Sequence, residues 1–496
     1  MGDLISEQFT NSVLAAITPT EEEILKQKSA ITKITEALAM YGSKAGFRYS
    51  RIQAEGSTGR KQTQLRGASD LDIFVVLKPE QYENIQEEEM GLRTSKVDEI
   101  MNSLVEEWFE PAVTVLEPMG VQKTYSQHPY LSLSYKGFDV DVVGCFELSA
   151  RELAMSGPIS AMDRTIHHTE YVVQHLDDAK RNDVRMLKSF VRASHTYADT
   201  CAVGRMGFTG YALELLIINT GGLRPALRAI VDLEHTPLDP KSRLVSHLRE
   251  IPAFRDDYVF IIDPTDPSRN VASSFDGRSY RLLKLLSSEF LKAIEETDGD
   301  RMRNLILEKP IPVAELPKWF LSKALVYEFE SDRSTHYTVL RDKLYRLGRQ
   351  VVSQISREPT GEKRFGDVIF EVFFEKETYS LGFLVESMTI PEFFPSRGPP
   401  LELDDAVRAF RKSHSVTFEE DGYVWAKRHR SQTSAEVEVR EFICTHKIGG
   451  LKLKKNPGPT SSKLLRVILE YVLPAEPGFP THQMKESIND ADKPRV

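Results

Sequence analysis

The residues best suited to chemistry lie in the stretch EGSTGRKQTQLRGASDLDIFVVL (55–77). It holds Gly56-Ser57, then Arg60, and then Asp70 and Asp72 at the start of a run of β-forming residues. Small residues let backbone N–H groups approach a triphosphate, and an arginine can bind its charge. Residues i and i+2 of a strand face the same way, so the two carboxylates lie about 7 Å apart on one face. Such like charges repel unless cations lie between them, and a two-metal site for phosphoryl displacement would supply those cations.

A two-metal site also needs a third carboxylate from a neighbouring strand. The segment FDVDVV (138–143) offers Asp139 or Asp141. The chain lacks the Walker pattern G-x-x-x-x-G-K-[ST], so a P-loop is excluded. Taken alone, two aspartates on a strand are also typical of a solvated strand edge, and both interpretations stay open at this point.

Hydrophobic spacing predicts the elements that position these carboxylates. Apolar residues recur at helical spacing before the stretch and alternate with polar ones within and after it. The predicted elements are a helix around 24–38, a strand at 71–77, an acidic helix near 87–108, a strand at 112–116 (AVTVL) and a hairpin of strands 130–135 and 138–143.

The remainder of the chain changes from helical to mixed character. A helix with Val184, Leu187 and Val191 on one face is expected, and the helix after residue 207 should end at Gly221-Gly222. Further predictions are a long helix at 335–355, paired strands in DVIFEVFFE and YSLGFLVES, and a flexible tail from residue 474.

The overall composition limits the class of protein. The chain has 496 residues, 41% of them hydrophobic and 28% charged, which is enough for more than one core. Neither a signal peptide nor an unbroken apolar run of about 18 residues is found, so a cytoplasmic protein without membrane contact is predicted. Three distant cysteines predict neither disulfides nor zinc. The net charge of −9 requires any RNA-binding surface to be local.

A row of cations marks one predicted helix. Arg181, Arg185, Lys188 and Arg192 follow at spacings of four, three and four, which places them on the face opposite Val184. This row could bind a triphosphate next to the aspartates, or it could be an ordinary solvated helix face.

Together with the stretch 55–77, five other segments resemble the polymerase-β-like nucleotidyltransferases. Within that superfamily they are similar to the archaeal-type (class I) CCA-adding tRNA nucleotidyltransferases. The segments are HPYLSLSYKGFDVDVVGC (128–145), MDRTIHHTEYV (162–172), VRMLKSFVRASHTY (184–197), GFTGYALELLI (207–217) and DPTDPSRNVA (263–272). The likeness covers roughly residues 47–275 and is looser beyond, where RGPPLEL (397–403) is the best match.

The resemblance implies a set of site residues. Two Mg²⁺ ions would be held by Asp70, Asp72 and Asp141, with Asp141 preferred because it begins DVV. Contacts to ATP or CTP would come from Ser57, Arg60, His168, Lys188, Tyr197 and Arg269. Among these, Arg269 matches the side chain that reads the incoming base. Gln127 stands where some members carry an acidic residue before HPY.

The resemblance also implies fold, partners and activity. The expected fold is α+β and multidomain: a mixed-sheet catalytic head (1–150), a helical neck (151–280), a tRNA-binding α/β body and tail (281–473) and a flexible end (474–496). The expected reaction adds C, C and A to tRNA from CTP and ATP, and a homodimer is possible. Basic residues proposed to contact tRNA are Lys427, Arg428, Arg430, Lys452, Lys454 and Lys455. The alternatives are a poly(A) or oligoadenylate polymerase, or a catalytically silent RNA-binding protein.

Overall fold

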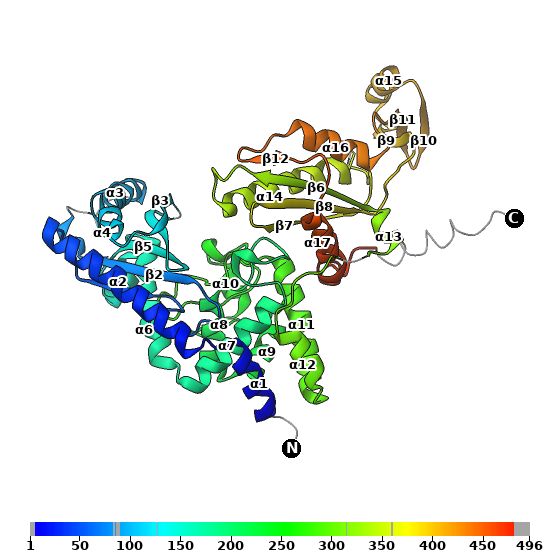
Figure 1. Ribbon diagram of the computed structural model, residues 1–496. Helices are drawn as coiled ribbons and strands as arrows, with labels where there is room; N and C mark the ends of the chain where they lie inside the picture. The colour runs from blue at the N-terminus through cyan, green and yellow to red at the C-terminus, as the bar shows by residue number, and fades with distance from the viewer. Residues whose placement is uncertain are drawn as a thin grey trace. The chain divides into compact units, whose positions relative to one another are not determined.

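The computed structural model describes residues 5–82, 85, 90–125, 127–313, 315–358 and 361–480. The chain forms two compact units (Figure 1). Unit 1 comprises Met1–Ala198, Phe208–Phe275 and Leu283–Glu308, and unit 2 comprises the rest. Unit 1 therefore contains most of both the expected head and the expected neck, and the boundaries at 150, 280 and 473 remain predictions.

Unit 1 is built on a five-stranded mixed sheet. Its spatial order is β1 (Arg51–Glu55), β2 (Asp70–Leu77), β5 (Phe138–Phe146), β4 (Pro129–Tyr135) and β3 (Met119–Tyr125). Strands β2 and β5 are parallel and the other neighbours antiparallel. The strand predicted at 71–77 and the hairpin predicted at 130–143 are thereby confirmed.

A different hydrophobic cluster packs on each face of this sheet. Leu71, Ile73 and Val75 of β2 lie in a large core with Trp108, which helices α2 (Glu21–Ala45), α3 (Met90–Leu104) and α4 (Glu110–Thr114) help to form. On the other face, Phe74 and Val76 pack with Ile166 of α6 (Arg164–His175). The polar residues at the start of β2 share this second face, because side chains alternate along a strand.

The strand expected at 112–116 is wrong. Helix α3 continues through the π-helical segment Val105–Phe109 into α4, and Ala112 and Val113 are fully buried in the core beside Trp108. The β-forming composition of AVTVL is overridden because the helical conformation buries these two side chains. The acidic helix expected near 87–108 is found from Met90 onward; its first residues lie outside the described ones.

The remainder of unit 1 is helical. It adds α1 (Glu7–Ile17), α5 (Ala150–Ser156), α7 (Asp178–Ala193), α8 (Gly210–Thr220), α9 (Leu223–Asp232), α10 (Val245–Arg249), most of α11 (Gly277–Glu295) and α12 (Gly299–Ile306). Helix α7 buries Val184, Leu187 and Val191 as predicted. Helix α8 ends at Gly221 in the left-handed conformation, φ 88°, which confirms the predicted cap.

Unit 2 holds two antiparallel sheets. The larger has the order β12 (Leu451–Leu453), β6 (Ala324–Ser331), β8 (Thr378–Val385) and β7 (Val368–Glu375). One face packs on α14 (Tyr337–Ser356) and α16 (Ala435–Thr445), and the other on α17 (Pro459–Val467), whose Leu464 lies against Gly382. The long helix and the paired strands predicted here are confirmed.

The smaller sheet forms a separate lobe of unit 2 with α15 (Asp404–Ser413) (Figure 1). Its order is β10 (Thr417–Glu420), β11 (Tyr423–His429) and β9 (Phe393–Pro400). A short helix, α13 (Lys318–Leu321), precedes β6. The α+β multidomain class is confirmed. Among the described residues, none of the helices combines the length and apolarity that a membrane crossing requires.

Candidate active site

Strand pairing brings the predicted carboxylates together. In the parallel pair β2–β5, Asp72 lies opposite Asp141 and Asp70 opposite Asp139. In the antiparallel pair β1–β2, Glu55 lies opposite Asp72. Asp141 and Asp72 also line one cavity of about 160 Å³, whereas the exposed Asp139 accepts a hydrogen bond from Ser69 (3.1 Å). Asp141, the choice made from the sequence, is therefore the residue beside Asp72.

The cavity has polar and apolar walls. Gln127, His128 and Tyr130 line it together with Met162 and the two aspartates. Burial and the nearby aspartates raise the pKa of Tyr130 to about 12, so its hydroxyl stays protonated and can donate a hydrogen bond. The departure at Gln127 noted in the sequence thus lies in the wall of this cavity.

The electrostatics of Asp72 indicate a place for a cation. Burial, followed by repulsion from Asp141 and Asp70, raises the pKa of Asp72 to about 7, although Lys61 opposes the shift. Oxygen ligands are those that Mg²⁺ prefers, and a cation would relieve the repulsion. Within the described part of the chain, no group of three or more His, Cys, Asp or Glu side chains is already arranged to hold an ion. Asp72 and Asp141 fit a metal as a pair, with Asp70 at the exposed start of β2.

Gly56 allows the backbone to approach Asp72 closely. Its φ is +70°, and a Cβ atom built on it would lie 2.3 Å from Asp72 Oδ2. The segment after Gly56 is a turn rather than the start of a helix, and the Thr58 hydroxyl ties it to the Asp70 carbonyl (2.6 Å). Ser57 is half-buried in this turn, and the Arg60 guanidinium is exposed, 3.9 Å from Glu55.

Lys188 belongs to a buried charge cluster that sequence reasoning missed. Its Nζ atom lies 3.0 Å from Glu214 of α8, and Lys61 Nζ lies 3.0 Å from the other Glu214 oxygen. The Thr63 hydroxyl donates to Glu214 (2.6 Å). Burial alone would raise the pKa of Glu214, but Lys188 and Lys61 outweigh burial and lower it to about 2. Two lysines and one glutamate leave one positive charge in this cluster.

Tyr197 lies at the same cluster. A Cβ atom at Gly210 would be 3.1 Å from the Tyr197 hydroxyl and 3.5 Å from Lys188 Nζ, so both groups flank this glycine. Burial and Glu214 raise the pKa of Tyr197 to about 12. The structure thus places Lys188 and Tyr197 together, as expected of residues that act at one site.

The cationic row of α7 is neither a solvated face nor an open phosphate site. Arg181 donates to the Lys61 carbonyl (3.3 Å), and Arg185 donates to the carbonyls of Gln62 (2.6 Å) and Gln64 (3.2 Å). These side chains fasten the segment after the Gly56 turn to α7. Arg192, at the end of the row, pairs on the surface with Glu308 (3.3 Å).

His168 and Arg269 meet at a second missed residue, Asp263. His168 Nε2 donates to Asp263 Oδ2 (2.7 Å), and Arg269 Nη1 donates to the same oxygen (3.0 Å). Burial would raise the pKa of Asp263, but its bonds to His168 and Thr265 lower it overall. Burial also lowers the pKa of His168, which keeps the ring neutral. Arg269 is thereby held in one orientation while about a third of its side chain stays exposed.

Tyr211 connects the two clusters. Its ring stacks on His168 with centroids 4.2 Å apart, Lys61 Nζ lies 5.0 Å over the ring, and its hydroxyl donates to Asp263 (3.1 Å). Glu214 and Asp263 lie within two of the segments that resemble the nucleotidyltransferases, 207–217 and 263–272. A lone carboxylate in the apolar run YALELLI is the signal that could have revealed Glu214, because an unpaired charge is rarely buried.

The basic residues of unit 2 differ in accessibility. Arg430 is buried and donates to Glu358 (2.7 Å), unlike the surface cation expected from the sequence. Lys454 pairs with the buried Glu328 (2.6 Å). Arg428, Lys452 and Lys455 are exposed.

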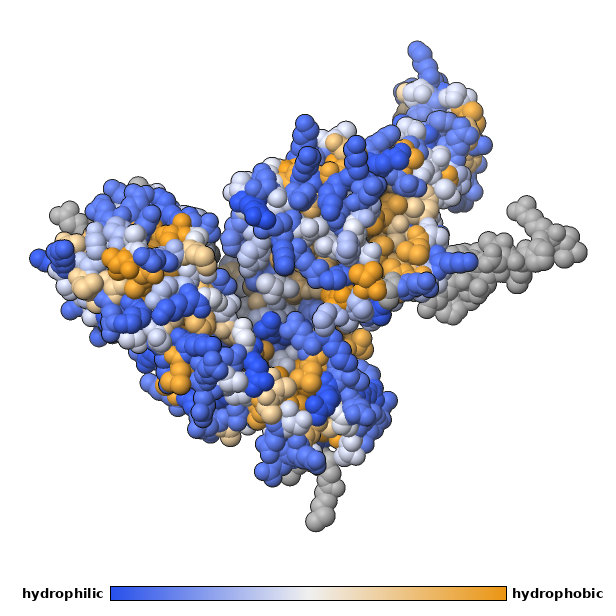
Figure 2. Space-filling model, in the orientation of Figure 1, coloured by the Kyte–Doolittle hydropathy of each residue, from blue (hydrophilic) through white to orange (hydrophobic). Residues whose placement is uncertain are grey.

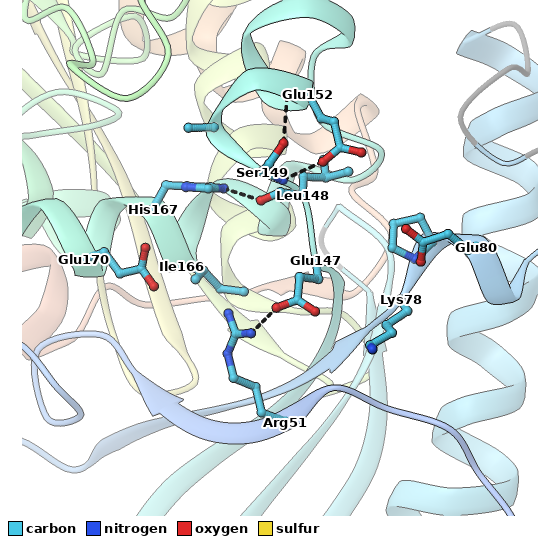
Figure 3. Close-up of a pocket in the computed structure, with 12 residues that line it drawn as sticks. Arg51, Lys78, Glu80, Glu147, Leu148, Ser149, Glu152, Ile166, His167 and Glu170 are labelled. Atoms are coloured by element: carbon cyan, nitrogen blue, oxygen red, sulfur yellow. Dashed lines mark hydrogen bonds and ion pairs between the residues drawn. The ribbon is translucent and has the colours of Figure 1, made fainter.

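A larger cavity, of about 800 Å³, lies at the opposite end of the unit 1 sheet (Figure 3). There Arg51, at the start of β1, pairs with Glu147, which follows β5. His167 Nε2 donates to the Leu148 carbonyl (2.9 Å). None of the predicted site residues lines this cavity, and its charged groups of both signs indicate no particular ligand.

Comparison with known proteins places these features in a family context. Residues 182–297 match the model of the tRNA nucleotidyltransferase second domain. The CCA-adding enzyme of Pyrobaculum islandicum is 28% identical over 410 residues, 82% of this chain and 84% of that one. The enzyme of the same name from Saccharolobus shibatae is 25% identical and covers 90% of this chain and 92% of its own length. That from Sulfurisphaera tokodaii is 26% identical and covers 87% of this chain and 90% of its own length.

Solved structures show more distant likeness. CdnC of E. coli MS115-1 with ATP has a TM-score of 0.44 and 15% identity over 62% of this chain and 98% of that one. A cytoplasmic RNA terminal U-transferase has a TM-score of 0.44 and 13% identity, and the match covers 62% of this chain and 100% of that one.

These findings indicate the class first: the chain is similar to enzymes of the tRNA nucleotidyltransferase type, in residues 182–297 by the family model and over most of its length by the curated relatives. The resemblance expected from the sequence, to the archaeal-type CCA-adding tRNA nucleotidyltransferases, is confirmed over most of the chain.

Proposed function

We propose that this enzyme adds C, C and A to the 3′ end of tRNA from CTP and ATP, with release of pyrophosphate and without a nucleic-acid template. The observation that carries the proposal is the pairing of Asp72 with Asp141 in one cavity, in a chain that resembles a CCA-adding enzyme over 90% of its length. That relatives bear this name supports the proposal.

The carboxylates have defined parts in this reaction. Asp70, Asp72 and Asp141 would hold two Mg²⁺ ions, which when bound lower the pKa of the tRNA 3′-hydroxyl and neutralise the leaving pyrophosphate. Asp72 is the central ligand because it lies between Asp141 on β5 and Glu55 on β1. The absence of a side chain at Gly56 leaves the space that the Asp72 carboxylate occupies.

The nucleotide would occupy the region between the two charge clusters. The single positive charge of the Lys61, Lys188 and Glu214 cluster suits the triphosphate, with Tyr197, Ser57 and Arg60 as further contacts. Arg269, fixed by Asp263 and His168, would hydrogen-bond the base edge. A site that pairs a buried edge in this way rejects bases that leave its polar groups unpaired.

The deciding experiment is incubation of the protein with Mg²⁺, CTP, ATP and a tRNA transcript that ends at the discriminator base, followed by sequencing of the 3′ end. Addition of C, C and A supports the proposal. A tail of A alone would indicate a poly(A)-type polymerase, and an unextended tRNA bound by the protein would indicate a silent RNA-binding member.

Gly56→Ala is expected to lower nucleotide addition about tenfold or more without unfolding the protein. The new methyl group must displace the Asp72 carboxylate, and misplacement of a catalytic group by about 1 Å can cost about a hundredfold in rate. Initial rates and thermal melts measure the two effects. Gly46→Ala is the matched control, since Gly46 has φ +81° but nothing within 4 Å of its Cβ position. Equal activity in both variants would contradict the assigned role of Gly56.

Replacement of Lys452 and Lys455 by Ala is expected to flatten the salt dependence of tRNA binding. Both are exposed at strand β12 and after it, and each lost phosphate contact lowers the logarithmic salt slope by about one unit. Lys454 is left intact because its removal would strip the buried Glu328 of its partner. The control replaces the exposed Lys28 and Lys44 of α2. If both double variants have the wild-type slope, the tRNA backbone lies elsewhere.

A further inference from the structure

Three polar side chains of β1 form a row that leads to Asp72. In the pairing of β1 with β2, Arg51, Gln53 and Glu55 lie opposite Val76, Phe74 and Asp72. Phe74 and Val76 pack on the α6 side of the sheet, and side chains paired across neighbouring strands share one face. The polar row therefore runs along the α6 side of β1 and ends beside Asp72.

Hydrogen bonds connect the members of this row. Arg51, whose ion pair with Glu147 is drawn in Figure 3, donates from Nε to Gln53 Oε1 (3.2 Å). Gln53 Nε2 donates in turn to Glu55 Oε1. Because the amide oxygen of Gln53 accepts from Arg51, its amide N–H groups are the ones left for Glu55. The row thus presents a donor to Glu55 and holds that carboxylate in place.

The burial of Glu55 requires an explanation, because a charged side chain is rarely buried without a strong partner. Hydrophilic side chains cover most of the face drawn in Figure 2, where water solvates them, whereas Glu55 is 0% exposed. Burial raises the pKa of Glu55, while Thr169 and Arg60 oppose this shift. The ion pair with Arg60 is loose, with Nη1 3.9 Å from Glu55 Oε1. A loose pair of this kind gives little net stability, so stability alone does not account for this buried charge.

Arg60 lies between Glu55 and solvent. The chain turns back after Glu55, since a Cβ atom on Gly59 would lie 2.2 Å from the Glu55 carbonyl oxygen, and this turn returns Arg60 to the Glu55 side chain. The Arg60 side chain is 39% exposed. A separation of 3.9 Å exceeds the length of a hydrogen bond, so the guanidinium keeps its N–H donors for a second anion. Its planar fork suits the oxygens of a phosphate group.

We propose that Glu55 is a positioning residue that directs the Arg60 guanidinium toward the triphosphate of the bound nucleotide. The role of Arg60 rests on the proposed function, in which it contacts that triphosphate. Glu55 attracts the guanidinium to the Asp72 end of the sheet, and Arg51 and Gln53 keep Glu55 from rotating away. A nucleoside triphosphate then meets a cation in a preset orientation, which lowers the ordering cost of binding.

The experiment measures the binding of CTP and of CMP to the full chain by calorimetry, with Mg²⁺ present. Glu55→Gln keeps the size of the side chain and an acceptor for Gln53. Its CTP affinity is expected to fall about tenfold, the effect of weakening one charge-assisted hydrogen bond. CMP, which carries one phosphate in place of three, should bind the variant as it binds the wild type. The matched control is Glu170→Gln, the same change of charge at a half-buried position of α6, which should leave both affinities unchanged.

A double-variant cycle separates positioning from a purely structural role. Arg60→Ala should weaken CTP binding more than Glu55→Gln does, and Glu55→Gln added to Arg60→Ala should cost nothing further, because Glu55 acts through Arg60. In CTP addition to tRNA, Glu55→Gln should raise KM and leave kcat unchanged, the pattern of a contact made equally in the ground and transition states. Gln53→Met, which removes the donor without a change of charge, should weaken CTP binding about threefold. It tests the same row if thermal melts show that Glu55→Gln does not fold.

A Glu55→Gln loss of CTP affinity that is equal with and without Arg60 would mark a structural role and overturn the inference. A lower kcat with a higher Mg²⁺ requirement would also overturn it, because Glu55 would then be a metal ligand. Binding and addition are separate measurements, so each idea can fail alone. The expected coupling in CTP binding without addition of C, C and A would support the role of Glu55 and refute the proposed activity. Normal addition with an unaltered CTP affinity in Glu55→Gln would refute only the role of Glu55.

Discussion

Asp72→Asn is expected to abolish nucleotide addition and, at the same time, to stabilise the metal-free protein above pH 7. Activity should be lost because the variant lacks the carboxylate that we propose as the central ligand of the two metal ions. Metal coordination supplies several kcal/mol of transition-state stabilisation, which corresponds to about a thousandfold or more in rate. The gain in stability follows from the pKa of Asp72.

The sign of the stability effect follows from the raised pKa. Asp72 has a pKa of about 7 in the folded chain against an ordinary value of 3.8. The contribution of this group to stability is therefore fully present below about pH 4 and is lost as the pH rises through 7. At pH 8 the ionised carboxylate is repelled by Asp141 and Asp70, and the neutral amide is not. We expect a gain on the order of 2 kcal/mol, below the full value of the pKa shift because Asp72 is partly exposed.

Thermal melts with and without Mg²⁺ provide the measurement. In the wild type, Mg²⁺ should raise the melting temperature by a few degrees at pH 8 and by less at pH 5.5, where protons compete for the same carboxylates. Asp72→Asn and Asp141→Asn should lose this response. Asp139→Asn, on the same strand but outside the cavity, is the control. A wild-type Mg²⁺ response in Asp72→Asn, or a lower stability at pH 8 than the wild type, would contradict the metal assignment.

Glu214→Gln is expected to destabilise unit 1 by about 3–5 kcal/mol, the cost of breaking a buried ion pair from one side. The amide keeps the shape of the side chain but leaves Lys61 and Lys188 buried without a counter-charge. Because the segment 61–64 is fastened to α7 next to this cluster, its amide hydrogens should exchange faster as well.

Urea unfolding and hydrogen exchange measure these effects. Glu308→Gln is the control, since its ion pair with Arg192 is about half exposed and surface pairs contribute at most about 1 kcal/mol. In the double variant Lys188→Met with Glu214→Gln, the loss should be smaller than the sum of the single losses, because the two side chains interact directly. Additive losses of stability, or a Glu214→Gln variant as stable as the control, would contradict the stabilising role assigned to the cluster of Lys61, Lys188 and Glu214.

Local pattern determined much of the fold. The alternation after Asp70 predicted β2 and placed both aspartates on one face, because side-chain direction along a strand depends only on the local backbone. The apolar spacing of α7 and the glycine at 221 were sufficient for the same reason. The strand predicted for AVTVL was wrong because burial against distant parts of the chain stabilises a helix there, in spite of its β-forming residues.

Only the tertiary structure decided which charges meet. The pairing of Asp72 with Asp141 depends on the register of strands far apart in sequence. Lys188 pairs with Glu214, and His168 and Arg269 bond to Asp263, because the packing of helices and loops brings these residues together. The local sequence around each residue does not indicate its partner. Arg430 was expected on the surface and is buried against Glu358. The residue type sets which charge is present, but the desolvation and pairing of that charge depend on neighbours brought together by the whole fold.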